Sequence, residues 1–159
     1  MAYKHNAPFH ADVVGSYLRP AELKAAREDF AAGKIDAAEL KAVEDKAITE
    51  LVTKQKATGL HVITDGEFRR AYWHLDFMWG LQGVSKGTNP VAVHGSNGSE
   101  VTETAAVSGE ISGENHPFIE HFKFVKQFED DNTVAKITVP SPAQTLFLLQ
   151  AGAAEDFTN

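Results

Sequence analysis

The chain has 159 residues, of which 43% are hydrophobic and 23% charged, as is usual for one globular domain. A formal net charge of -7 leaves no basic surplus for nucleic acid or an anionic membrane surface. No apolar run reaches the roughly 18 residues that a membrane-spanning helix needs. The sequence contains no cysteine, which excludes disulfides and thiolate metal ligands within this chain. We therefore expect a cytoplasmic protein that binds neither nucleic acid nor membrane.

The first predicted elements are a strand and a helix. Ala11–Ser16 resembles a short strand that ends at a glycine turn. Pro20 suits the first position of a helix, and Ala21–Ala32 is rich in helix-forming residues until Gly33 ends it.

A second helix and a second strand follow. Asp36, with Glu39 three residues later, has the spacing of a capping box at a helix N-terminus. The apolar residues after it keep helical spacing, and Gly59 fits the position just past the helix end. Leu60–Thr64 is then a compact β-branched run typical of a buried strand.

The middle of the chain predicts an antiparallel hairpin at about residues 91–113. Val91–Ser96 and Glu100–Val107 flank Asn97-Gly98, a strong signal for a tight hairpin turn. The segment Gly109–Gly113 is expected to continue this antiparallel insertion.

The last third returns to alternating helix and strand. Pro117 opens a predicted helix, Val134–Val139 is a third strand, and Gln144–Leu149 begins another helix. This order implies parallel strands covered by helices, but three strands are too few for a complete barrel or doubly wound sheet. We therefore predict an α/β chain forming the N-terminal part of a (β/α)8 TIM barrel with an inserted β-hairpin. Residues 1–159 would be one partial domain of three βα units.

Two carboxylates directly follow the second predicted strand. If Asp65 and Glu67 are both extended, their side chains project to the same side and could divide acid and base roles or hold a cation. The alternative is an ordinary turn at a strand end, with Glu67 paired to Arg69 or Arg70. The spacing alone leaves both interpretations open.

A possible anion site follows the first predicted strand. The hydroxyl of Ser16 and the backbone N–H groups at Gly15-Ser16 could hold a carboxylate or phosphate, with Arg19 close behind. Alternatively, Ser16 caps the following turn and Arg19 serves only the surface.

The seven histidines do not form a local zinc motif, because none shows His-x-x-x-His or His-x-His spacing. His74 lies within an aromatic group and is a weaker candidate for touching a ligand. That group is either a stacking platform or, by our preference, a cluster buried under the hairpin.

Three motifs in order resemble the cobalamin-independent methionine synthase family, most closely its short members that consist of the catalytic barrel alone. They are Val13-Val-Gly-Ser-Tyr-Leu-Arg-Pro, Asp65-Gly-Glu-Phe-Arg-Arg with Trp73-His-Leu-Asp-Phe, and Thr138-Val-Pro-Ser-Pro. The resemblance covers nearly the whole chain and implies a TIM barrel. It also implies an activity, the transfer of a methyl group from 5-methyltetrahydrofolate or a related donor to homocysteine sulfur, which gives methionine.

The resemblance also implies roles for particular residues. Gly15 and Ser16 would hold the amino acid's carboxylate, and Glu67 would bind its α-amino group. Arg19, Asp65 and His74 remain weaker candidates at the same rim, and no residue is assigned a catalytic role.

In the family, zinc held by His, Glu and two Cys activates the thiol, and these ligands would lie outside this chain. We therefore expect the chain to be inactive by itself, although it could self-associate through exposed strand edges. Two alternatives stay open: a metal-independent barrel lyase or hydrolase using Asp65 and Glu67, and a non-catalytic binding module.

Overall fold

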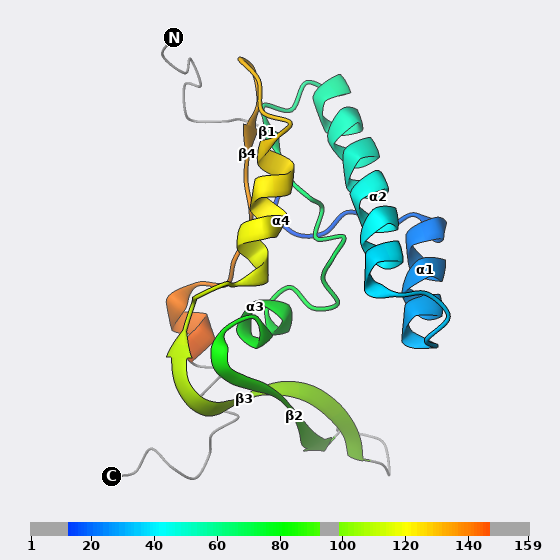
Figure 1. Ribbon diagram of the computed structural model, residues 1–159. Coiled ribbons are helices and arrows are strands. Elements are labelled where there is room, and N and C mark those ends of the chain that lie inside the picture. Colours follow the sequence, from blue (N-terminus) through cyan, green and yellow to red (C-terminus); the bar gives the residue numbers. More distant parts are fainter. Residues whose placement is uncertain (1–12, 93–98, 147–159) are drawn as a thin grey trace. The chain divides into compact units, whose positions relative to one another are not determined.

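The computed structural model describes residues 13–92 and 99–146 (Figure 1). These residues form two compact units, which are described separately. The first unit combines residues up to Arg70 with Glu120–Thr138, and the second combines Ala71–Ile119 with the residues after Thr138. No helix in the described part of the chain has the length and apolar character that crossing a bilayer requires.

The first unit begins with two helices whose ends match the sequence signals. Helix α1 (Ala21–Ala31) follows Pro20, which occupies the N-cap position rather than the first helical one. Helix α2 (Ala37–Ala57) starts with the predicted capping box. The Asp36 carboxylate accepts the backbone N–H groups of residues 38 and 39, while the Glu39 side chain accepts the N–H of Asp36. These bonds satisfy N–H groups that would otherwise have no partner at the helix start.

A parallel strand pair forms the centre of this unit. Strand β1 (Val62–Ile63) pairs with β4 (Val134–Ala135) in the register Val62↔Val134, and the two lie side by side in Figure 1. Both strands are shorter than the predicted runs, but their parallel orientation agrees with the prediction. Their carboxyl ends therefore lie at one edge, where Glu67 and Thr138 follow within a few residues.

Helices and strands of the first unit share one hydrophobic core. Its buried members come from α1, α2, β1, the following turn, α4 (Pro117–Lys126) and β4. They are Leu23, Ala47, Ile48, Leu51, Val52, Ile63, Phe68, Val125 and Ala135. This core fixes the turn after β1, because Phe68 in that turn is 2% exposed and packs into it.

The predicted strand over Ala11–Ser16 is not observed for residues 13–16, and residues 11–12 lie outside the described part. This segment makes isolated contacts instead of a strand ladder: the Val13 carbonyl accepts a 2.6 Å hydrogen bond from Lys136 Nζ. Gly15 has φ +91°, which interrupts an extended conformation. The first of the three predicted strands is therefore replaced by irregular backbone at residues 13–16.

The second unit contains the hairpin. Strands β2 (Gln82–Ala92) and β3 (Ser99–Ser112) pair antiparallel, with Ala92 opposite Ser99 and an irregularity near Gln82. The hairpin is confirmed, but it begins at Gln82 rather than near residue 91, and Gly109–Gly113 largely continues β3. The predicted turn Asn97-Gly98 lies outside the described residues.

A short helix packs on this hairpin. Helix α3 (Leu75–Trp79) contributes Leu75 and Met78 to a second core with Ala105 of β3. The Trp79 indole N–H also donates a 3.1 Å hydrogen bond to the Thr104 carbonyl. The predicted helix from Gln144 is helical from residue 142 to 146, beyond which the chain is not described.

Candidate functional site

The turn after β1 presents Glu67 in an unusual backbone conformation. Gly66 and Glu67 have φ of +64° and +56°, so both lie in the left-handed region. The Asp65 carboxylate accepts the Glu67 backbone N–H through Oδ1 at 2.9 Å. The two residues are therefore not both extended. The condition under which their carboxylates would project to the same side of a strand is not met. Asp65 instead holds the turn that displays Glu67.

The carboxylate of Glu67 is buried and held through one oxygen. Thr138 Oγ1 donates a 2.9 Å hydrogen bond to Glu67 Oε1, and Arg70 Nη1 lies 3.5 Å from the same oxygen. Glu67 and Arg70 are only 6% and 2% exposed. Among the described residues, Glu67 Oε2 takes part in no hydrogen bond or ion pair. This oxygen is therefore available to a cationic partner.

Two arginines support the same turn from α1 and the segment before it. Arg19 Nη2 donates to the carbonyls of Glu67 at 2.9 Å and Arg70 at 2.6 Å. Arg27 donates to the carbonyls of Phe68 at 2.6 Å and Arg70 at 3.0 Å. Arg19, a candidate anion-binding residue from the sequence, is thus engaged with backbone carbonyls, an arrangement that positions the turn.

The segment carrying Gly15 and Ser16 lies against this turn. The Tyr17 N–H donates a 3.1 Å hydrogen bond to the Gly66 carbonyl, which brings the residue after Ser16 next to the residue before Glu67. Ser16 itself is exposed, so its hydroxyl is accessible to a ligand. The structure therefore brings Gly15, Ser16, Arg19, Asp65 and Glu67 together in the first unit.

His74 belongs to the second unit, where aromatic rings surround it. Its ring centroid lies 4.7 Å from that of Trp73 and 6.3 Å from that of Tyr72. Removal from water lowers the pKa of His74 below its ordinary value, although the nearby Asp76 carboxylate opposes this shift. Tyr72 and Trp73 stay 41% and 45% exposed, so only part of the aromatic group is covered by the hairpin.

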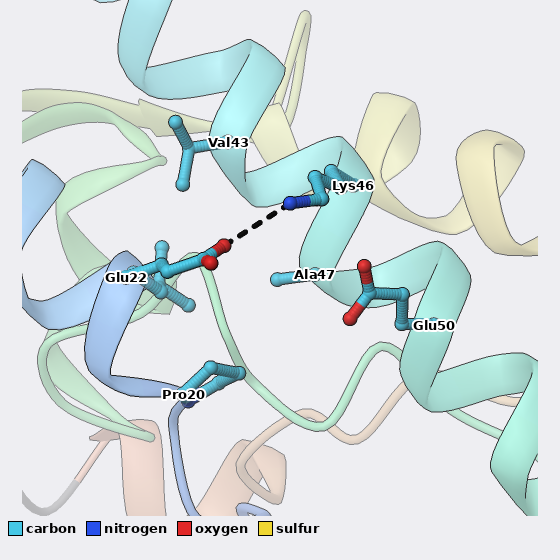
Figure 2. Close-up of a pocket in the computed structure, with 7 residues that line it drawn as sticks. Pro20, Glu22, Val43, Lys46, Ala47 and Glu50 are labelled. Carbon is cyan, nitrogen blue, oxygen red and sulfur yellow. Dashed lines mark hydrogen bonds and ion pairs between the residues drawn. The ribbon is translucent and has the colours of Figure 1, made fainter.

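A shallow pocket between α1 and α2 contains none of the predicted site residues. Figure 2 shows Lys46 reaching across it to Glu22, with Nζ and Oε2 3.1 Å apart. Apolar and charged side chains both line it; they are Pro20, Glu22, Leu23, Val43, Lys46, Ala47 and Glu50. With two carboxylates and one ammonium group, the lining carries a net negative charge.

Sequence reasoning missed Thr138 as a site residue. Thr138 appears in the sequence analysis only within the third motif and near the end of the predicted strand Val134–Val139. The observed β4 ends at Ala135, so Thr138 lies beyond the strand, at the edge where the carboxyl end of β1 also lies. Arg70 was considered only as a partner of Glu67 in the ordinary-turn interpretation, and that pairing is observed. Arg69 instead pairs with Glu44 at 2.9 Å and with Asp45.

The described residues do not fit a zinc site. They contain no group of three or more His, Cys, Asp or Glu side chains arranged to hold a metal ion, and the sequence has no cysteine. No step through a metal is therefore assigned to residues of this chain.

Helices packed on a parallel strand pair define a mixed α/β protein, with polar side chains near the carboxyl ends of the strands. Residues 9–140 match the family model described as the catalytic domain of cobalamin-independent synthase. The chain belongs to this family.

Individual relatives agree with this membership. A crystal structure of a candidate vitamin-B12-independent methionine synthase from Listeria monocytogenes is 45% identical, with a TM-score of 0.72 over 89% of this chain and 39% of that one. The uncharacterized protein YxjG of Bacillus subtilis (strain 168) is 42% identical over 88% of this chain and 37% of its own length. A methionine synthase of Sulfurisphaera tokodaii is 31% identical over 82% of this chain and 37% of its own. The chain thus spans less than two-fifths of these relatives.

Proposed function

We propose that this chain supplies the amino-acid-binding part of a methyltransferase of the cobalamin-independent methionine synthase type. The reaction transfers a methyl group from 5-methyltetrahydrofolate, or a related donor, to homocysteine sulfur and yields methionine. The proposed architecture is the N-terminal part of a (β/α)8 barrel carrying an inserted hairpin. Family membership and the strand-end position of Glu67 support this proposal.

The observation that carries the proposal is the state of the Glu67 carboxylate. One oxygen is held by Thr138 and Arg70, and the other takes no part in the contacts among described residues. An unengaged carboxylate oxygen on a largely buried side chain suits a primary ammonium group, because the two can form a charge-assisted hydrogen bond. We therefore assign the α-amino group of the amino acid to Glu67 Oε2.

The carboxylate of the amino acid is assigned to Gly15 and Ser16. The exposed Ser16 hydroxyl and neighbouring N–H groups are donors suited to an anion. The contact of Tyr17 with Gly66 keeps these donors on the Glu67 side of the unit. One unit therefore contains hydrogen-bond donors for a carboxylate and an acceptor for an ammonium group. These match the two charged groups of a zwitterionic amino acid.

Activation of the sulfur is assigned to groups outside this chain. In a complete enzyme, zinc would lower the pKa of the homocysteine thiol and favour the nucleophilic thiolate. The methylfolate contacts are likewise unassigned here. We therefore expect the chain to bind the amino acid without transferring the methyl group.

The alternative of an acid–base lyase or hydrolase has less support in the geometry. Asp65 Oδ1 is committed to the backbone N–H of Glu67, and Glu67 Oε1 accepts from Thr138. Both carboxylates therefore have partners within the protein. A proton-transfer pair would instead need both carboxylates to face a substrate.

Calorimetric titration with L-methionine and L-homocysteine tests the proposal. Glu67→Gln should weaken affinity at least about tenfold, because a buried charge partner of the ammonium is lost. The matched control is Glu28→Gln, which changes an exposed carboxylate of α1 and should leave affinity unchanged. Equal affinities for wild type and Glu67→Gln, with both variants folded by circular dichroism, would contradict the assignment.

A further inference from the structure

We infer that Thr138 is a positioning residue that makes the site selective for ligands carrying an α-amino group. The inference rests on the proposed function and adds to it a residue outside the Gly-Ser and Gly-Glu motifs. Thr138 would act through Glu67, by fixing which carboxylate oxygen is engaged and which faces the ligand.

The hydrogen bonds give the Thr138 hydroxyl a defined direction. A hydroxyl carries one proton to donate and lone pairs to accept. Arg70 Nη1 lies 3.4 Å from Thr138 Oγ1 as a donor, and guanidinium groups cannot accept. The single hydroxyl proton is therefore directed to Glu67 Oε1, at 2.9 Å.

The strand register explains why Thr138 can reach Glu67. Residues Ile63 and Ala135 are opposite each other in the parallel pair, and the Lys136 N–H donates to the Ile63 carbonyl at 2.9 Å. The chains leaving β1 and β4 thus depart from one edge. Thr138 and Glu67, which are 71 residues apart in sequence, meet there.

The ion pair with Arg70 does not replace this hydrogen bond. At 3.5 Å, Arg70 Nη1 neutralises charge near Oε1 but exceeds the usual length of an N–H···O hydrogen bond. A glutamate side chain also loses rotational freedom about several bonds when it is held in one conformation. Holding Glu67 before the ligand arrives spares that ordering cost at the moment of binding.

A selectivity role predicts a difference between two ligands. L-methionine carries the α-amino group, whereas 4-(methylthio)butanoate has the same carboxylate and thioether without it. If Thr138 positions Glu67, its substitution should lower the affinity only for L-methionine. If Thr138 merely supports the fold, its substitution should lower the affinity for both ligands.

The test is the affinity of the 159-residue chain for both ligands, measured by calorimetry and, for weak binding, by ligand-observed NMR. Thr138→Val removes the hydroxyl at nearly constant volume and should weaken L-methionine binding about tenfold, as expected for a lost hydrogen bond to a charged group. The affinity for 4-(methylthio)butanoate should stay within about twofold of wild type, because this ligand has no ammonium group for Glu67 to bind. Thr138→Ser should restore L-methionine binding, and Thr53→Val, at an exposed position of α2, is the matched control.

The outcomes separate this inference from the proposed function. If wild type binds neither L-methionine nor L-homocysteine, the proposed function and this inference both fail. If wild type binds and Glu67→Gln abolishes binding while Thr138→Val does not, only the role of Thr138 is overturned. An equal loss for both ligands in Thr138→Val also overturns it, because the effect is then structural.

Discussion

The side chain of Gln55 pairs with the backbone of Thr64 through two hydrogen bonds, as a neighbouring strand would. Gln55 Nε2 donates to the Thr64 carbonyl at 2.8 Å, and Gln55 Oε1 accepts the Thr64 N–H at 3.0 Å. Gln55 is 2% exposed and lies near the end of α2. A helix side chain thus satisfies the backbone where β1 stops and the Glu67 turn begins.

Replacing Gln55 with leucine should destabilise the first unit. The change leaves a buried N–H and a buried carbonyl of Thr64 without partners, so we expect the free energy of unfolding to fall by about 2–4 kcal/mol. Urea denaturation followed by circular dichroism measures this. Gln127→Leu, at an exposed position, should change stability by no more than about 0.5 kcal/mol. Equal effects of the two changes would show that the pairing with Thr64 contributes nothing.

Gly66 should tolerate no side chain. An added Cβ would lie 2.4 Å from Leu51 Cδ2, and the φ of +64° is strained for any other residue. Gly33 has a similar φ of +70° but open space around a Cβ. Gly33→Ala should therefore cost about 1 kcal/mol and Gly66→Ala about 2–4 kcal/mol, since a clash adds to the conformational cost. Thermal unfolding of the two variants compares them, and equal losses would contradict the clash.

Arg19 should act on ligand affinity through the turn rather than by contact with an anion. Arg19→Gln removes the donors to the carbonyls of Glu67 and Arg70, so the turn should loosen. We expect a loss of stability of about 1–3 kcal/mol together with weaker L-methionine binding. Lys24→Gln, at an exposed position of α1, controls for the lost charge. Weaker binding without any loss of stability would instead indicate direct contact between Arg19 and the ligand.

The lowered pKa of His74 predicts a pH dependence. Because burial places the folded-state pKa below the unfolded value of about 6.5, the unfolded chain binds the proton more readily. The stability contribution of neutral His74 is therefore complete above about pH 6.5 and is lost as pH falls through the folded pKa. NMR titration of the imidazole resonances measures this pKa. Trp73→Ala should raise it toward 6.5 by admitting water, and an unchanged pKa would contradict desolvation as the cause.

The elements that the sequence predicted are those whose ends are determined by residues close together in the chain. The Asp36–Glu39 capping box and Gly59 depend on neighbouring residues, and helix α2 has the predicted ends. The hairpin was predicted from Asn97-Gly98 and the two segments that flank it, although its start at Gln82 was not predicted. The irregular backbone at residues 13–16 was not predicted, because the hydrogen bonds of Val13 and of the following Tyr17 involve Lys136 and Gly66, which are distant in the sequence.

The sequence indicated which side chains follow β1, but it did not predict their geometry. Glu67 was placed correctly at a strand end, but its φ of +56° is unusual for a residue with a side chain. That conformation depends on Asp65 and on the carbonyl contacts of Arg19, which no local pattern reveals. The partnership with Thr138 depends on the register of two strands that are distant in the sequence.

The division of the first unit into two stretches of chain has a consequence for how it is made. A ribosome synthesises α1, α2 and β1 well before β4, and the whole hairpin emerges between them. The hairpin strands are close together in the sequence and can pair quickly. Strand β1 can pair only after β4, which is much farther along the chain, has been synthesised. During that delay β1 has no strand partner from β4 and Glu67 lacks Thr138. Acquisition of the ligand site should therefore be a late event in biosynthesis, one that a pulse-labelling experiment on nascent chains of increasing length would time.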